Sequence, residues 1–184
     1  MFSLALCLSM LAAATAVPSR SVPYEEDPRH YSEQHIMDMV AVGEKLFVYQ
    51  RNYNTETTRR CLYAEMIEAK SETEYRYTLG AKQDGQYYSF QVTSILSTTG
   101  NHHQYNAATY PSDKEVAPKL RKQMTKGPAS DCFILVEEID EKGKGCQLMV
   151  TSSVASSGVI PKRCKDVYEQ QCTGPSIVLY DNSC

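Results

Sequence analysis

The cysteines constrain the fold of this chain more than any other feature of its sequence. There are seven among 184 residues, and one of them, Cys7, lies in an apolar leader. The other six are Cys61, Cys132, Cys146, Cys164, Cys172 and Cys184. An even number of cysteines in a secreted chain indicates disulfides, and six cysteines allow fifteen pairings. Because five of the six lie in the last third, we expect that third to be crosslinked within itself, with Cys61 tying it to the first half.

Residues 1–16 are typical of a secretory signal peptide. The stretch is strongly apolar, carries no charged side chain and ends in Ala14-Thr15-Ala16, a small-residue pattern found at cleavage sites. It is too short to span a membrane, and no later stretch reaches the required apolar length. We therefore expect the mature protein to be secreted and extracellular, with no membrane association.

Composition and motifs exclude several classes of function. The formal net charge of −3 is far from the basic surface that a nucleic-acid binder needs. The sequence has no GxSxG, HExxH, Walker or GxGxxG motif, and oxidised cysteines cannot act as nucleophiles, so we expect no enzyme activity and no cofactor. It has no CxxC, and its four histidines lie far from every cysteine, so we expect no metal site. His102-His103 follows a turn-like stretch and is expected in a surface loop.

Hydrophobic periodicity divides the rest of the chain. Residues 17–30 are Pro-rich and acidic and predict an irregular arm, followed by one domain over residues 31–184. A helical spacing over 31–42 and another over 160–171 predict a helix near each end, with a small-residue connector at 152–158. Between the helices the apolar period is two, which predicts strands. The expected strands and extended pieces are 46–53, 62–67, 75–79, 88–94, 104–110, 115–123, 132–139, 146–151 and 177–180.

About eight short strands with a helix at each end predict an eight-stranded antiparallel up-and-down barrel. A barrel of this size encloses room for one small ligand, or is filled by its own side chains. A sandwich of two sheets fits the strand count as well, but gives no reason for a crosslinked helix near the C-terminus.

Three stretches resemble the salivary lipocalins of ticks, the histamine-binding-protein-like family. They are EKLFVYQRNYNTETTRRCLYAEM at 44–66, SDCFILVEEIDEKGKGCQLMVT at 130–151 and IPKRCKDVYEQQCTGPSIVLYDNSC at 160–184. The resemblance implies a lipocalin barrel with a short N-terminal helix and a C-terminal helix stapled by disulfides. It also selects one set of pairings, namely Cys61–Cys184, Cys132–Cys164 and Cys146–Cys172.

These bonds would decide which side of each strand faces the lumen. If Cys132 and Cys146 face the helix, alternation turns Phe133, Leu135, Gln147 and Met149 inward, and Glu137 as well. The remaining lumen candidates come from the other strands. On the second strand, two of them point inward if Cys61 points outward, and the rest are aromatic residues of strands whose apolar side chains alternate. These remaining candidates are Tyr53, Ala64, Met66, Tyr77, Tyr88 and Phe90. Whether the aromatic residues line a ligand cavity or fill a core stays open at this point.

The resemblance also implies a ligand class. The family's best-known ligands are biogenic amines such as histamine and serotonin, held by carboxylates and aromatic rings. Its pattern has an Asp directly after Cys132 and Glu-Leu-Trp or Glu-Leu-Tyr directly after Cys146. This chain has Phe133 and Gln147-Leu148-Met149 instead. We therefore expect a monomeric protein that sequesters a small hydrophobic host mediator, such as a leukotriene, a thromboxane or a sterol-like ligand, rather than an amine.

Two alternatives remain. One is amine binding, and the other is inhibition of a host protein such as a complement component through outer loops, for which the region 100–129 is a candidate. Among possible polar anchors for a lipid, Tyr53, Tyr77 and Arg76 stand out, although strict alternation turns Arg76 away from its tyrosine neighbours and toward solvent.

Overall fold

The structure is a computed structural model that describes residues 22–139 and 143–184. The predicted signal peptide, the first residues of the predicted arm and part of the loop expected after residue 139 lie outside the described residues. In the described part of the chain, no helix has both the length and the apolar character needed to cross a membrane.

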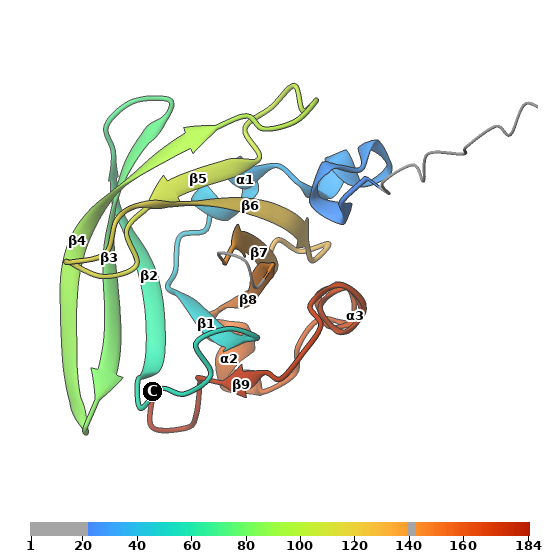
Figure 1. Cartoon of the computed structure of the whole chain (residues 1–184). Coiled ribbons are helices and arrows are strands. Elements are labelled where there is room, and N and C mark those ends of the chain that lie inside the picture. The colour runs from blue at the N-terminus through green and yellow to red at the C-terminus, as the bar shows by residue number, and fades with distance from the viewer. Residues whose placement is uncertain (1–21, 140–142) are drawn as a thin grey trace, which may run out of the picture.

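The strands form one antiparallel sheet that closes on itself (Figure 1). They are β1 (Leu46–Arg51), β2 (Arg60–Ala69), β3 (Glu74–Gln83), β4 (Gln86–Ser97), β5 (Ala107–Tyr110), β6 (Lys119–Lys126), β7 (Cys132–Glu138), β8 (Lys144–Thr151) and β9 (Ile177–Val178). Neighbours in sequence pair from β2 to β8, β8 pairs with β1, and β1 returns to β2. Because this closure leaves no open edge, β1 to β8 make the predicted eight-stranded barrel, and the sandwich is excluded. The short β9 pairs with the end of β1.

Alternation along β7 and β8 separates two buried clusters. Phe133, Leu135 and Met149 pack inside the barrel, whereas Ile134 and Leu148 pack outside it against the C-terminal helix. All five are almost fully shielded from solvent. These two strands are therefore apolar on both faces, as the sequence pattern predicts for strands covered by a helix.

One irregularity in β1 changes which side chains enter the barrel. The β1–β8 register pairs Val48 with Met149, shifts between Val48 and Gln50, and then pairs Arg51 with Gln147. Strict alternation from the inward Val48 would turn Arg51 outward. The extra residue reverses this, because a bulge flips every following side chain to the other face.

The N-terminal segment is more ordered than predicted. Residues expected in an irregular arm form two 3₁₀ helices, η1 (Tyr24–Glu26) and η2 (Pro28–Glu33), and the helix expected over 31–42 is the shorter α1 (Ile36–Val40). The Asp27 carboxylate caps η2 by accepting the Arg29 N–H at 3.0 Å. Ile36, Met39 and Val40 are buried among the lumen residues, so α1 closes one end of the barrel.

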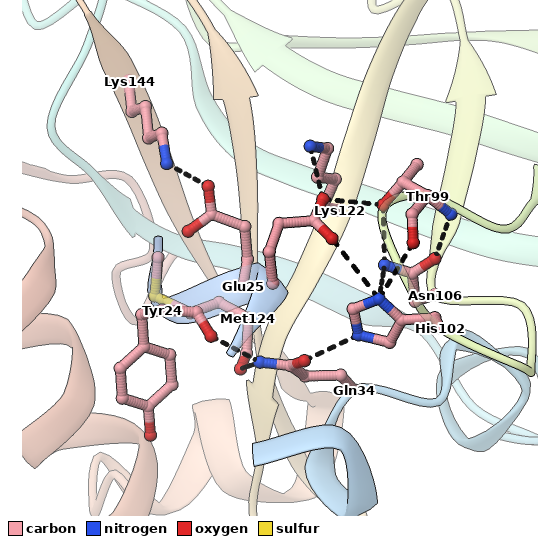
Figure 2. A network of polar contacts seen from close by, with 10 residues as sticks. Tyr24, Glu25, Gln34, Thr99, His102, Asn106, Lys122, Met124 and Lys144 are labelled. Carbon is pink, nitrogen blue, oxygen red and sulfur yellow. Dashed lines mark hydrogen bonds and ion pairs between the residues drawn. The ribbon is translucent and has the colours of Figure 1, made fainter. Parts of the chain in front are cut away.

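A polar network fastens this segment to the barrel (Figure 2). His102 Nε2 lies 2.7 Å from Gln34 Oε1, and Glu26 accepts hydrogen bonds from Lys122 Nζ at 2.6 Å and Thr99 Oγ1 at 2.9 Å. His102 is only 7% exposed, so its expected place in a surface loop is wrong, whereas His103 is exposed. The N-terminal segment covers His102, and the residues around position 102 contain no pattern that predicts this contact with Gln34.

Three disulfides anchor the C-terminal region. They join Cys61 to Cys184, Cys132 to Cys164 and Cys146 to Cys172, the order that the family resemblance implies. Two of them hold α3 (Lys162–Gln171), or the residue directly after it, against the outer face of β7 and β8. The expected connector at 152–158 contains a short helix, α2 (Ser152–Ser157), which the Thr151 hydroxyl caps at the Val154 N–H.

Candidate functional site

The barrel contains a cavity of about 760 Å³ at the end opposite α1. The loop between β1 and β2, the β3–β4 hairpin and the loop between β5 and β6 surround its mouth. Exposed residues of the first loop, such as Asn54 and Glu56, form part of the rim. The volume lies within the usual range for small-molecule sites, roughly 300–1,000 Å³.

Six of the ten predicted lumen residues line this cavity. They are Tyr53, Ala64, Tyr88, Phe90, Gln147 and Met149. They come from four strands or strand ends, β1, β2, β4 and β8. Alternation places five of them, whereas the bulge in β1 turns Tyr53 inward. Burial raises the pKa of Tyr53 well above its ordinary value, which keeps its phenol neutral and able to donate a hydrogen bond.

Of the other four, one lines a second pocket of the lumen and three line neither of these two pockets. Tyr77 borders the inner pocket described below. Phe133 and Leu135 are fully buried and fill the barrel core between the cavity and α1. Met66 is one of the last five residues of β2, all of which are exposed. It is itself 39% exposed and lines neither pocket.

An apolar pocket continues the cavity toward α1. Its open volume is only about 30 Å³, and it shares Ala64, Leu79, Tyr110 and Met149 with the cavity. Met39 and Val40 of α1 and Leu96 of β4 form its far wall. The lumen is therefore polar at the mouth and apolar toward α1.

A buried ion pair crosses the lumen wall between β6 and β7. Arg121 Nε and Glu137 Oε2 lie 2.6 Å apart, and their side chains are 3% and 5% exposed. The N–H does not point at this oxygen, so the contact is an ion pair rather than a directed hydrogen bond. Arg121 also donates to the Tyr110 carbonyl at 2.8 Å and lies 4.2 Å from the centroid of the Tyr110 ring. The charge of Glu137 is therefore already compensated.

Arg51 also lines the cavity, and the sequence analysis missed it. The bulge in β1 turns it inward, and a bulge leaves no pattern in a single sequence. Arg76, which we considered as an anchor, borders neither pocket and pairs with Glu68 at 2.9 Å. Arg121 lies opposite the inward Glu137 in the β6–β7 register, and the sequence analysis missed it as well.

A second ion pair spans the mouth. Arg59 Nη1 from the β1–β2 loop contacts Asp113 Oδ2 from the β5–β6 loop at 2.6 Å. In an eight-stranded up-and-down barrel these two loops leave opposite sides of the ring, so the pair bridges the opening. The Arg59 guanidinium also lies 5.6 Å from the centroid of the Tyr88 ring on the β3–β4 hairpin.

Comparisons with known proteins agree with this architecture. A family model described as tick histamine binding protein matches residues 24–184. A search of curated proteins finds no match. Japanin from Rhipicephalus appendiculatus, solved bound to cholesterol, is 12% identical with a TM-score of 0.57, and the match covers 78% of this chain and 96% of Japanin.

Two further solved structures share the fold. The siderocalin Ex-FABP is 13% identical with a TM-score of 0.52, covering 76% of this chain and 94% of its own. Insecticyanin from the tobacco hornworm Manduca sexta is 10% identical with a TM-score of 0.53, covering 82% of this chain and 85% of its own. At these identities the structural likeness establishes a lipocalin fold, and the family model adds the family. The chain belongs to the tick histamine-binding protein family.

Proposed function

We propose that this protein is a secreted, monomeric lipocalin that sequesters a small host mediator in its barrel without chemistry, and that the mediator is a lipid rather than an amine. One observation carries the proposal. The lumen holds a cavity of about 760 Å³ whose two half-buried or buried carboxylates, Asp113 and Glu137, are already paired with arginines. Such a cavity has room for a ligand, and the one lining carboxylate without an ion-pair partner in the described part of the chain, that of Glu56, is exposed at the rim.

The positions that carry acids in amine binders support the same choice. Phe133 is fully buried in the apolar core, and Gln147 and Met149 are neutral cavity residues. An ammonium ion in this lumen would have to displace Arg121 from Glu137, which would leave one buried charge without a partner. A lipid needs only apolar walls and a few polar groups near the mouth. Japanin, a structural neighbour, was solved with the apolar ligand cholesterol.

The alternative of a host-protein inhibitor rested on the region 100–129 as a long outer loop. Strands β5 and β6 take up residues 107–110 and 119–126 of that region, and residues 111–118 form the loop between them. That loop borders the cavity mouth through Ser112, Asp113 and Val116. Its position therefore favours a role in ligand entry.

Native mass spectrometry and calorimetry with a fixed ligand panel would test the proposal. The panel contains histamine, serotonin, leukotriene B4, a thromboxane analogue and cholesterol. We expect one lipid to bind at a ratio of one to one with submicromolar affinity, and the amines to bind at least 100-fold more weakly. Nanomolar binding of histamine, or no binding of any lipid together with capture of a complement protein, would overturn it.

Secretion has its own test. We propose that residues 1–16 are removed during export, which leaves a chain that starts at Val17. Sequencing the N-terminus of protein secreted from insect cells should return VPSRS. Retention of residues 1–16 in secreted material would contradict the proposed cleavage.

A further inference from the structure

Arg51 differs from the other two arginines of the cavity because, in the described part of the chain, it has no acidic partner. Its Nη2 donates to the Asn54 carbonyl at 2.9 Å, and its guanidinium carbon lies 5.3 Å from the centroid of the Tyr53 ring. Its Nε is buried and has no hydrogen-bond partner within residues 22–139 and 143–184. Burial lowers the pKa of Arg51 from its ordinary value, which reflects the cost of holding this charge away from water. This Nε is shielded from the cavity as well as from solvent, so a ligand would meet the terminal nitrogens of the guanidinium instead.

The other charged side chains around the cavity do not supply Arg51 with a partner. Glu137 pairs with Arg121 and Asp113 pairs with Arg59, and in the described part of the chain no carboxylate lies within 4.0 Å of Arg51. Lys119 at the start of β6 adds another positive charge to the lining, and the remaining acid, Glu56, is exposed. The lining thus carries four cationic and three acidic side chains, which favours an anion.

Between Arg51 and α1, the lumen is lined by apolar side chains that could accommodate an acyl chain. Val48, one residue before the bulge, lines the same cavity, and Met149 and Ala64 line both the cavity and the inner pocket. Beyond them the walls are the apolar side chains of Met39, Val40 and Leu96. The open space near α1 is small, but two of these walls are methionines, whose flexible side chains adjust readily to a guest.

We propose that Arg51 anchors the carboxylate of an acyl lipid through the terminal nitrogens of its guanidinium, and that the acyl chain extends from the mouth toward α1. This inference rests on the proposed function and deepens it by naming the ligand class as a monocarboxylic acyl lipid. Arginine suits this role because its planar donors match a carboxylate and its charge is not lost at physiological pH. Tyr53, beside Arg51, supplies a second donor to the same head group.

The test compares a fatty acid with its neutral ester. Binding of cis-parinaric acid and of its methyl ester is followed by their fluorescence in the wild-type protein, in Arg51→Gln and in Arg76→Gln. The control is well matched, because Arg76 also has a buried Nε without a partner but lies outside both pockets, where it pairs with Glu68. Unchanged ester binding in Arg51→Gln shows that this variant keeps its fold and cavity.

We expect the wild type to bind the acid at least tenfold more tightly than the ester. Arg51→Gln should lose about tenfold or more of the acid affinity and none of the ester affinity, because a hydrogen bond to a charged group is worth about 1.5–3 kcal/mol. Arg76→Gln should bind both probes as the wild type does. Equal binding of acid and ester by the wild type, or full acid affinity in Arg51→Gln, would overturn the anchor while leaving the lipid function standing.

A head-group probe separates failure of the function from failure of the anchor. If the wild type binds neither parinaric probe, the Nε–H resonance of Arg51 is followed by NMR during titration with benzoate. A saturating shift that Arg51→Gln abolishes would support the anion site and reject only the acyl chain. No shift would overturn the anchor as well.

Discussion

At the scale of single residues, the pair of Arg121 and Glu137 has the largest consequence for stability. Replacing Glu137 by Gln would leave the Arg121 guanidinium buried without its counter-charge, and losing one partner of a buried pair costs about 3–5 kcal/mol. Because Arg121 keeps its bond to the Tyr110 carbonyl and borders the cavity, we expect a loss of roughly 3 kcal/mol in the free energy of unfolding. Denaturant unfolding measures it.

The matched control is Glu68→Gln, which removes the partner of Arg76. That pair is 44% and 35% exposed, and exposed pairs contribute about 0–1 kcal/mol. Equal losses in Glu137→Gln and Glu68→Gln would show that the lumen pair is as well hydrated as the surface pair.

The tyrosines give a residue-scale prediction for alkaline pH. Burial raises the pKa of Tyr77 well above its ordinary value of about 10. Its folded-state pKa is raised, so the neutral phenol contributes stability below pH 10, and that contribution is lost as the pH rises further. We expect Tyr77→Phe to leave the 295 nm absorbance change between pH 9 and 11 unaltered in the native protein.

In guanidinium, where every phenol is exposed, the same variant should lose one of 13 tyrosine contributions. A native Tyr77 signal of ordinary size would mean that water reaches the inner pocket.

At the scale of elements, the Arg59–Asp113 pair ties two opposite mouth loops together. Arg59 holds the pKa of Asp113 below its ordinary value, so the pair persists across physiological pH and is lost only as the pH falls through that lowered value. We expect Asp113→Asn to speed both entry and release of a bound lipid by about fivefold, because a partly exposed pair contributes about 1 kcal/mol. The equilibrium affinity should change little.

Stopped-flow fluorescence with cis-parinaric acid measures both rates. Asp166→Asn is the control, since it removes an equally simple pair with Lys162 on the outer helix α3. Unchanged rates in Asp113→Asn would show that the two loops do not gate the mouth.

At the scale of the whole molecule, Cys61–Cys184 closes the longest loop in the chain described. The two cysteines are 123 residues apart, whereas Cys132 and Cys164 are 32 apart. In the chain-entropy model their removal costs about 5 and about 4 kcal/mol respectively. The first bond also fixes the C-terminal strand beside β1, where the Cys61 N–H donates to the Leu179 carbonyl at 2.8 Å.

We therefore expect the double variant Cys61→Ala with Cys184→Ala to lose about 5 kcal/mol in denaturant unfolding. Cys132→Ala with Cys164→Ala is the comparison, and it should lose about 1 kcal/mol less if loop length dominates. The reverse order would show that packing around α3 outweighs loop entropy.

Much of the fold could be predicted because it depends on local patterns. Period-two alternation locates the strands, and it assigns the faces of β7 and β8 correctly once one cysteine on each is placed outside. Five of the six lumen candidates that line the cavity do so for the same reason, whereas Tyr53 lies beyond the bulge in β1. The prediction that Met66 lines the lumen is not met, because alternation does not indicate which part of a long strand extends past the packed barrel into solvent.

The sequence by itself determined that the chain forms strands between two helical ends, carries cysteines suited to disulfides and lacks the acids of an amine site. The tertiary structure alone decided that Arg51 enters the lumen, that Arg121 neutralises Glu137 and that the N-terminal segment buries His102. The physical reason is the range of the forces involved. Alternation is written into neighbouring residues, whereas a bulge, an ion pair between strands and a covering segment depend on partners that only the closed barrel brings near.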